Sequence, residues 1–103
     1  VIGVTPKLGT SIQGLRNPEE PYPTQLFRKE HFDEIIEIEK EEVEKTFEIA
    51  RKIAREEGLF VGMSSASIIY VALKKSKELG KDKIIVAILP DNGDKYLSTK
   101  LFE

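Results

Sequence analysis

The sequence predicts an α/β fold in which parallel strands and flanking helices form part of a doubly wound sheet. Three observations carry this prediction. An amphipathic helical pattern occupies residues 41–57, a second helical pattern runs from Ser64 to Leu79, and a continuous apolar, β-rich run follows at residues 83–89. Strands that are apolar on both faces are typical of parallel sheets with helices on each side. We therefore expect a layered α/β arrangement.

The first third of the chain combines one short strand with a long irregular stretch. Residues 1–5 form an apolar run that we expect to be a buried strand, closed by Pro6. No apolar period persists over residues 6–31, and glycines and prolines interrupt them throughout. These residues are Gly9, Gly14, Pro18, Pro21 and Pro23. Because the chain opens directly inside an apolar run and without methionine, we expect it to be a piece of a larger fold.

The middle of the chain predicts a short strand and then the clearest helix. Residues 32–38 contain three isoleucines and fit a strand. Over Glu41–Glu57 the apolar residues recur on one helical face, with charged residues opposite. The recurring residues are Val43, Phe47, Ala50 and Ala54. Gly58 is placed for a left-handed cap after the helix.

A glycine and a group of serines mark the start of the second helix. Leu59–Val61 lead into Gly62, after which Ser64, Ser65 and Ser67 precede a second apolar run. The pattern indicates an extended segment, a tight turn and a helix N-terminus. Such a start offers free backbone N–H groups at the positive end of the helix dipole, and small residues permit close approach of a ligand. A serine cap on a buried helix is the commoner explanation of the same residues.

The last residues predict a buried strand, a turn and a short helix or docked tail. The strand is the run at 83–89, the turn is Pro90–Asp94, and residues 96–102 follow. Ligands in parallel α/β sheets collect at the carboxyl ends of strands. We therefore expect the loop after Val4, the turn at 62–67 and the turn at 90–94 to meet.

Composition limits the classes of function. The 103 residues suffice for one domain, and the net charge of −2, with acids and bases interleaved, argues against nucleic-acid binding. The chain has no cysteine for a disulfide or thiolate, and a single histidine, His31, leaves little scope for a metal site. We expect no metal, no membrane contact and a soluble, cytoplasmic protein.

Three fragments, in this order and spacing, resemble motifs in the C-terminal third of cysteine synthases. The fragments are Ile12-Gln13-Gly14, Glu57-Gly58-Leu59-Phe60-Val61-Gly62-Met63-Ser64-Ser65 and Leu89-Pro90-Asp91-Asn92-Gly93-Asp94-Lys95-Tyr96-Leu97-Ser98-Thr99. This family contains O-acetylserine sulfhydrylases and cystathionine β-synthases, which are fold-type-II pyridoxal-phosphate enzymes. The resemblance covers essentially residues 1–103. It implies a single segment from the C-terminal portion of the large cofactor domain, and a homodimer.

The resemblance implies a cofactor role for the two turns. Ser64 would form a hydrogen bond with the pyridine nitrogen of pyridoxal 5′-phosphate, and Gly62, Pro90 and Asp91 would border the cofactor. A neutral hydroxyl at the positive end of a helix disfavours a protonated ring. An unprotonated ring suits β-elimination and β-replacement on an activated serine.

The loop after the first strand would bind the substrate. The resemblance places Gln13 and Gly14 there. Where the family usually continues Gly-Ile-Gly, this chain reads Gly14-Leu15-Arg16, which resembles members that carry an arginine in this loop, including those that accept O-phosphoserine. A guanidinium binds a phosphate dianion bidentately. Arg16 is therefore a candidate donor-substrate anchor, and an ordinary exposed arginine is the equal alternative.

The family's Schiff-base lysine, substrate-carboxylate loop and phosphate loop have no counterpart in this sequence. We therefore expect no catalytic residue in these 103 residues, inactivity of the segment alone, and cysteine biosynthesis from O-acetylserine or O-phosphoserine and sulfide once the remainder of the enzyme is present. A non-catalytic α/β binding or assembly module of the same ancestry is the alternative. A hydrolase with Ser64 in a nucleophile elbow is a weaker one, because its histidine would follow the serine, whereas His31 precedes it.

Overall fold

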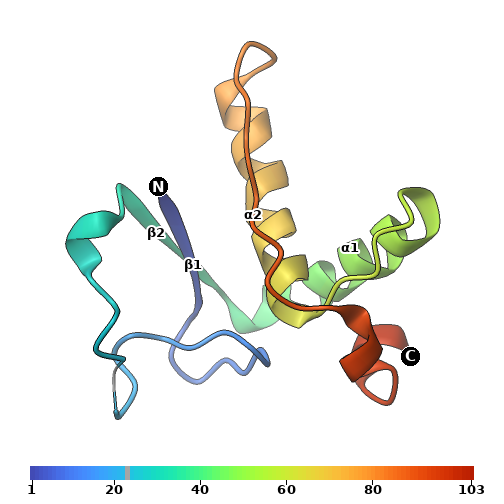
Figure 1. Ribbon diagram of the computed structural model, residues 1–103, viewed down its shortest axis with the longest axis horizontal. Helices are drawn as coiled ribbons and strands as arrows, with labels where there is room; N and C mark the ends of the chain where they lie inside the picture. The colour runs from blue at the N-terminus through green and yellow to red at the C-terminus, as the bar shows by residue number, and fades with distance from the viewer. Residues whose placement is uncertain (23) are drawn as a thin grey trace.

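The computed structural model describes residues 1–22 and 24–103, so that Pro23 of the irregular stretch lies outside the described residues. Two strands, two α-helices and four short 3₁₀ turns follow one another along the chain (Figure 1). They are β1 (Ile2–Pro6), η1 (Lys29–His31), β2 (Glu34–Ile38), η2 (Lys40–Glu42), α1 (Val43–Glu56), α2 (Met63–Leu79), η3 (Gly93–Tyr96) and η4 (Lys100–Phe102). The α/β class is confirmed.

The sheet consists of β1 and β2, which pair in parallel. The register runs from Ile2 opposite Glu34 to Pro6 opposite Ile38. Both strands were predicted, and β1 is shifted by one residue, from the expected residues 1–5 to Ile2–Pro6. Pro6 is compatible with this because it is the last residue of its strand, where a missing N–H costs little. Residues 7–22 and 24–28 then form the expected irregular stretch before η1.

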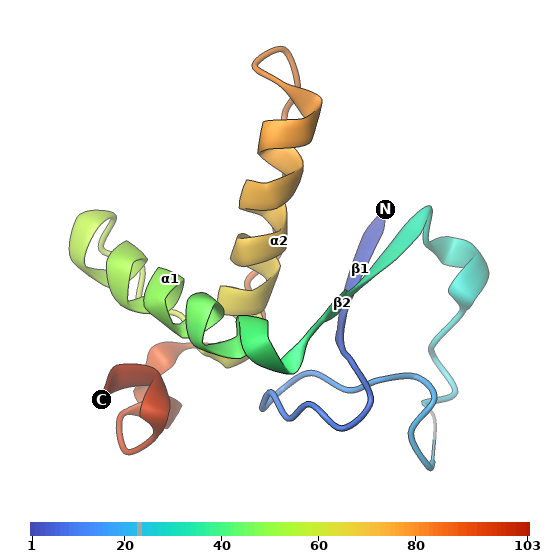
Figure 2. The same ribbon diagram turned by 180° about the vertical axis from the view of Figure 1, so that it is seen from behind.

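The helices lie on one side of this ribbon and pack against each other near the start of α2 (Figures 1 and 2). The buried face of α1 contains Phe47 and Ala50, as its periodicity predicts, together with Thr46, whose hydroxyl donates to the Val43 carbonyl at 2.7 Å. Gly58 has a φ of 68°, which confirms the left-handed residue after the helix. No helix of the described residues is long and apolar enough to cross a membrane.

The core joins both helices to the sheet and to the C-terminal turns. Its buried apolar members are Ile12, Ile38, Phe47, Ala50, Val61, Met63, Ala66, Val71, Tyr96 and Leu101. The expected short helix or docked tail is present as η3 and η4, which Leu101 anchors in this core. Leu101 is fully buried, so burial of apolar area holds the C-terminal turns against α1.

The predicted strand at 83–89 is wrong for this chain. Residues 83–89 are not assigned to a strand, and Ile84, Val86 and Ile88 are 93%, 82% and 73% exposed. The run passes along α2 (Figure 1) and is separated from β1 by a groove of about 500 Å³. A strand needs a neighbour that satisfies its N–H and C=O groups, and the described strands pair with each other instead. The apolar composition was correctly identified, but it does not by itself bury the run.

Candidate functional site

The first turn of α2 is polar and lies inside the molecule. Ser64, Ser65 and Ser67 are at most 2% exposed, whereas Ile68 and Ile69 further along are only partly buried. Half of the buried residues of this helix are serines, and the others are Met63, Ala66 and Val71. Buried polar groups require hydrogen-bond partners. Ser67 donates to the Met63 carbonyl at 3.0 Å, one helical turn back.

Asp91 supplies the main partner, from the turn after the exposed run. Its Oδ1 accepts from the backbone N–H and the hydroxyl of Ser65, at 2.9 and 2.5 Å. Its Oδ2 accepts from the backbone N–H of Ser64 at 3.1 Å and from the Tyr96 hydroxyl at 3.0 Å. The helix therefore receives its N-terminal cap from a carboxylate 27 residues away, and no serine side chain caps it.

Main-chain hydrogen bonds fix the two turns to each other. Val61 and Asn92 form an isolated antiparallel bridge. On either side of it, the N–H of Gly62 donates to the Asp91 carbonyl at 3.1 Å, and the N–H of Gly93 donates to the Phe60 carbonyl at 3.0 Å. These bonds place the Asp91 side chain over the start of α2.

Two glycines are required by close contacts at this point. A Cβ atom on Gly62 would lie 2.4 Å from Asp91 Oδ2 and 2.5 Å from the Tyr96 ring. A Cβ atom on Gly14 would lie 3.2 Å from the Cβ and Oγ of Ser64, and Gly14 also has a φ of 88°. The loop after β1 therefore reaches Ser64. The expected meeting of the three loops is observed.

The environment favours the charged form of Asp91 and the neutral form of Tyr96. Burial acts to raise the pKa of Asp91, but the hydrogen bonds from Ser65 and Ser64 outweigh it and lower that pKa below its ordinary value. Burial, together with the hydrogen bond to the Asp91 carboxylate, raises the pKa of Tyr96. At neutral pH the pair is thus an anion and a neutral hydroxyl donor.

The structure brings most of the predicted site residues together. Gly14, Gly62, Ser64 and Asp91 contact one another as described, while Gln13 and Pro90 are exposed neighbours of Gly14 and Asp91. Arg16 is exposed and contacts its own loop. Its guanidinium donates to the Pro21 carbonyl and lies 3.5 Å from the Glu20 carboxylate.

Sequence reasoning missed the parts of Ser65 and Tyr96 in this network. The available signal for Tyr96 was its position five residues after Asp91, since a buried tyrosine hydroxyl usually has a hydrogen-bond partner. Nothing local in the sequence pairs Ser65 with Asp91, because their proximity results from the bridge between the two turns.

The arrangement does not support the hydrolase alternative. His31 lies in η1, which is on the far side of the β1–β2 ribbon from the start of α2 in both views (Figures 1 and 2). The N–H of Ser65, the residue after the nucleophile that such a hydrolase would use for its oxyanion, is bonded to Asp91.

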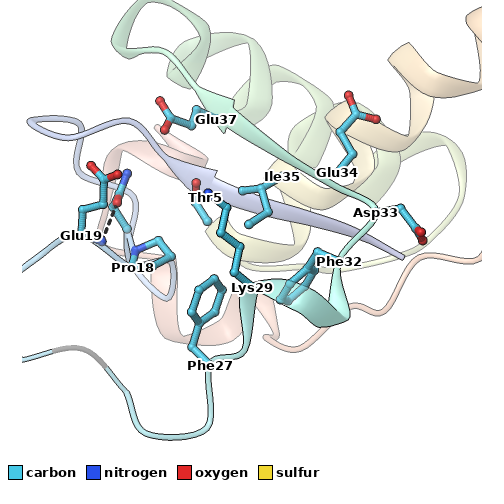
Figure 3. A pocket seen from close by; sticks show the side chains of 11 residues that line it. Thr5, Pro18, Glu19, Phe27, Lys29, Phe32, Asp33, Glu34, Ile35 and Glu37 are labelled. Carbon is cyan, nitrogen blue, oxygen red and sulfur yellow. Dashed lines mark hydrogen bonds between the residues drawn. The ribbon is translucent and has the colours of Figure 1, made fainter.

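A separate pocket of about 360 Å³ lies on the face of the sheet that carries Thr5, Ile35 and Glu37 (Figure 3). Phe27 and Lys29 border it, and the Thr5 hydroxyl has no hydrogen-bond partner within the described part of the chain. None of the predicted site residues lines this pocket. We therefore place the candidate site at the start of α2.

Sequence comparison finds relatives named as cysteine synthases. Cysteine synthase B of Pseudomonas aeruginosa is 33% identical over 103 residues, which is 100% of this chain and 33% of that protein. A cysteine synthase of Staphylococcus aureus is 45% identical over 73 residues, which is 71% of this chain and 23% of that protein. The chain thus matches a third or less of the length of these relatives. No family model matches it.

Solved structures of a cysteine synthase and of a cystathionine β-synthase share the fold. Cysteine synthase from Entamoeba histolytica superposes with a TM-score of 0.82 at 30% identity, over 99% of this chain and 32% of that one. The O-acetylserine-dependent cystathionine β-synthase from Helicobacter pylori superposes with a TM-score of 0.74, also at 30% identity, over 99% of this chain and 34% of that one.

Proposed function

The chain belongs to the cysteine synthase family, and we propose that it forms part of an enzyme that makes cysteine by pyridoxal-phosphate-dependent β-replacement on an O-activated serine. The observation that carries this proposal is the convergence of Ser64, Gly14 and Asp91 at the start of α2. The proposed roles of the other cofactor- and substrate-binding residues depend on the same convergence.

The residues present fit one edge of the cofactor. Ser64 has a neutral hydroxyl, and its neighbour Gly14 has no side chain that would crowd it. This combination suits the nitrogen edge of a flat aromatic ring. When bound, the cofactor stabilises negative charge at the substrate Cα while the β-substituent leaves. In this proposal Ser64 holds the ring nitrogen, Gly62 and Pro90 lie beside it, and Gln13 and Gly14 face the amino-acid substrate.

Asp91 changes the electrostatic argument made from the sequence. The helix dipole was expected to disfavour a protonated ring at Ser64, yet the Asp91 carboxylate bonds the very N–H groups that carry the positive end of that dipole. The preference for an unprotonated ring therefore depends on the neutral Ser64 hydroxyl. Each carboxylate oxygen of Asp91 already accepts two hydrogen bonds. We therefore propose that Asp91 holds the residues beside the cofactor in place and does not contact the cofactor itself.

The remaining parts of the active site would come from outside these residues. In the family resemblance, the Schiff-base lysine and the phosphate loop lie in a preceding portion, and the 103 residues contain neither motif. We propose that the segment is inactive alone and acts in the cytoplasm within a homodimer that contains this portion.

The donor substrate is a finer part of the proposal. The Helicobacter pylori neighbour is described as O-acetylserine-dependent. Arg16 supports O-phosphoserine for this chain, because an exposed guanidinium in the substrate loop is able to exchange a surface carboxylate for a phosphate. Its contact with Glu20 at 3.5 Å is a solvent-exposed pair of small expected energy.

The test uses the full gene product that contains this segment. We expect the purified protein to carry a cofactor absorption band and to release cysteine from sulfide and either O-phosphoserine or O-acetylserine. Ser64→Ala is expected to lower cofactor affinity, with the exposed, helix-borne Ser76→Ala as its matched control. A colourless product that neither binds added cofactor nor forms cysteine would instead support the non-catalytic module.

A further inference from the structure

The backbone N–H groups at the N-terminus of α2 bind the chain's own Asp91 carboxylate. Free N–H groups and the dipole make a helix start attractive to phosphate or sulfate. Here Asp91 takes the N–H groups of Ser64 and Ser65 at 3.1 and 2.9 Å. An external anion at these amides would have to displace the Asp91 side chain or be repelled by its negative charge.

The Asp91 carboxylate has no acceptor capacity left for a ligand. An ionised carboxylate offers about four lone-pair positions. Ser65 fills Oδ1 with an N–H and a hydroxyl, and Ser64 and Tyr96 fill Oδ2. Asp91 is therefore positioned to act through the residues that it bonds.

Tyr96 controls the oxygen that faces Ser64. Its hydroxyl donates to Oδ2, the same atom that accepts from the Ser64 N–H. Tyr96 is buried, and its ring lies against Gly62, where a Cβ would be 2.5 Å away. The Tyr96 ring, the Asp91 carboxylate and the start of α2 are thus packed against one another.

We propose that Asp91, held by Tyr96, is a positioning residue that closes the start of α2 to anions and fixes the place of Ser64, so that its hydroxyl meets the ring nitrogen. The second half of this inference rests on the proposed function. The first half concerns the protein without any cofactor, so the two are separable by experiment.

The first arm measures anion binding by the full gene product without cofactor. Thermal unfolding is followed in sodium sulfate and in sodium chloride of equal ionic strength. Asp91→Gly frees the two amides, and Asp91→Asn removes the charge while keeping the shape. We expect sulfate to raise the unfolding midpoint of both variants more than that of the wild type. Asp94→Asn, an exposed carboxylate on η3, is the matched control and should behave as the wild type. The wild-type response subtracts the general stabilisation by sulfate.

The second arm uses the cofactor-loaded protein. Asp91→Asn should weaken cofactor binding about tenfold, because the charged hydrogen bond that holds the Ser64 N–H is lost. The pH at which the absorption band of the bound cofactor changes should fall by about half a unit, because a neighbouring negative charge has been removed. Tyr96→Phe keeps the charge, so it should weaken binding without moving this pH.

Outcomes of the two arms separate the inference from the function. An Asp91→Asn protein with the sulfate response and pH profile of Asp94→Asn would overturn the proposal and leave Asp91 as a cap only. If Asp91→Gly does not fold, the Asn variant decides. A wild-type protein that binds no cofactor would contradict the proposed function, and the sulfate arm would then decide whether Asp91 closes the helix start.

Discussion

The start of α2 and the loop at Gln13–Arg16 were both expected to bind ligands, and they are built in opposite ways. At the start of α2, every hydrogen-bonding group of the Asp91 carboxylate is used and the serines are buried. In the loop, Gln13 and Arg16 are exposed, and only Gly14 is in close contact with the other region. A packed network fixes position, whereas an open loop tolerates variation. Substitutions should therefore affect folding in the first region and substrate choice in the second.

The strongest test of this contrast is Gly62→Ala. The added methyl group would overlap Asp91 and the Tyr96 ring at 2.4–2.5 Å, so either the cap or the ring must move. We expect a loss of about 3 kcal/mol in the free energy of unfolding, at the upper end of overpacking costs. Urea unfolding of the full gene product measures it. A loss no larger than that of Gly9→Ala, whose methyl group meets open space, would contradict the packed network.

Gly14→Ala tests the single point where the two regions touch. Its left-handed backbone costs a β-carbon about 1–2 kcal/mol, and the methyl group would press on Ser64 at 3.2 Å. Gly9→Ala is a close control, because Gly9 has a φ of 85° in the same loop and nothing within 4 Å. We expect Gly14→Ala to be the more destabilised variant and to lose cofactor affinity. Equal unfolding midpoints for the two variants would show that the contact with Ser64 carries no energy.

The packed region should contribute to the pH dependence of stability through Asp91 and Tyr96. The pKa of Asp91 is lowered in the folded state, so its stabilisation is present above the ordinary carboxylate pKa near 3.9 and is lost as pH falls through the lower, folded value. The pKa of Tyr96 is raised, so its stabilisation is complete below pH about 10 and is lost as pH rises through the folded value.

Unfolding midpoints of wild type, Asp91→Asn and Tyr96→Phe across pH measure these contributions. We expect the variants to lose stability relative to wild type at neutral pH and to approach it at the acid extreme for Asp91 and the alkaline extreme for Tyr96. Parallel curves for wild type and variants at all pH values would rule out linkage through these groups.

The smallest effect on stability is expected for Arg16→Ala. Its ion pair with Glu20 is exposed, so the change in the free energy of unfolding should stay below about 0.5 kcal/mol. If Arg16 anchors a phosphate, kcat/KM for O-phosphoserine should fall roughly tenfold or more, as for other charge-assisted contacts, while that for O-acetylserine changes little. Arg55→Ala, at an exposed position in α1, is the control. An equal loss with both donors would assign Arg16 no role in donor selection.

The helices and strands that were predicted correctly are those whose signal lies in neighbouring residues. The periodicity of residues 41–57 located α1, the β-rich start located β1, and the glycine before the serines located the start of α2 within one residue. These elements follow from side-chain spacing, which a sequence displays directly. The three loops also meet as expected, but the Val61–Asn92 bridge joins two of them, because residues 83–89 form no strand.

Long-range partners could not be predicted in the same way. The cap of α2 was assigned to nearby serines, because a carboxylate 27 residues away becomes available only after the Val61–Asn92 bridge has formed. Burial of residues 83–89 was inferred from apolar composition, but burial also requires neighbours that the composition does not specify. The family resemblance selected Asp91, while its detailed contacts required the folded geometry.

The exposed run along α2 has a practical consequence for handling the segment. Residues 84–89 are six uncharged, mostly β-favouring residues without proline, and no backbone hydrogen bond of the described chain engages them. Such stretches add strands from other molecules and seed insoluble assemblies. Solutions of the isolated segment should become turbid as the protein concentration rises. Val86→Lys, at a side chain that is 82% exposed, should delay this turbidity without disturbing Asp91.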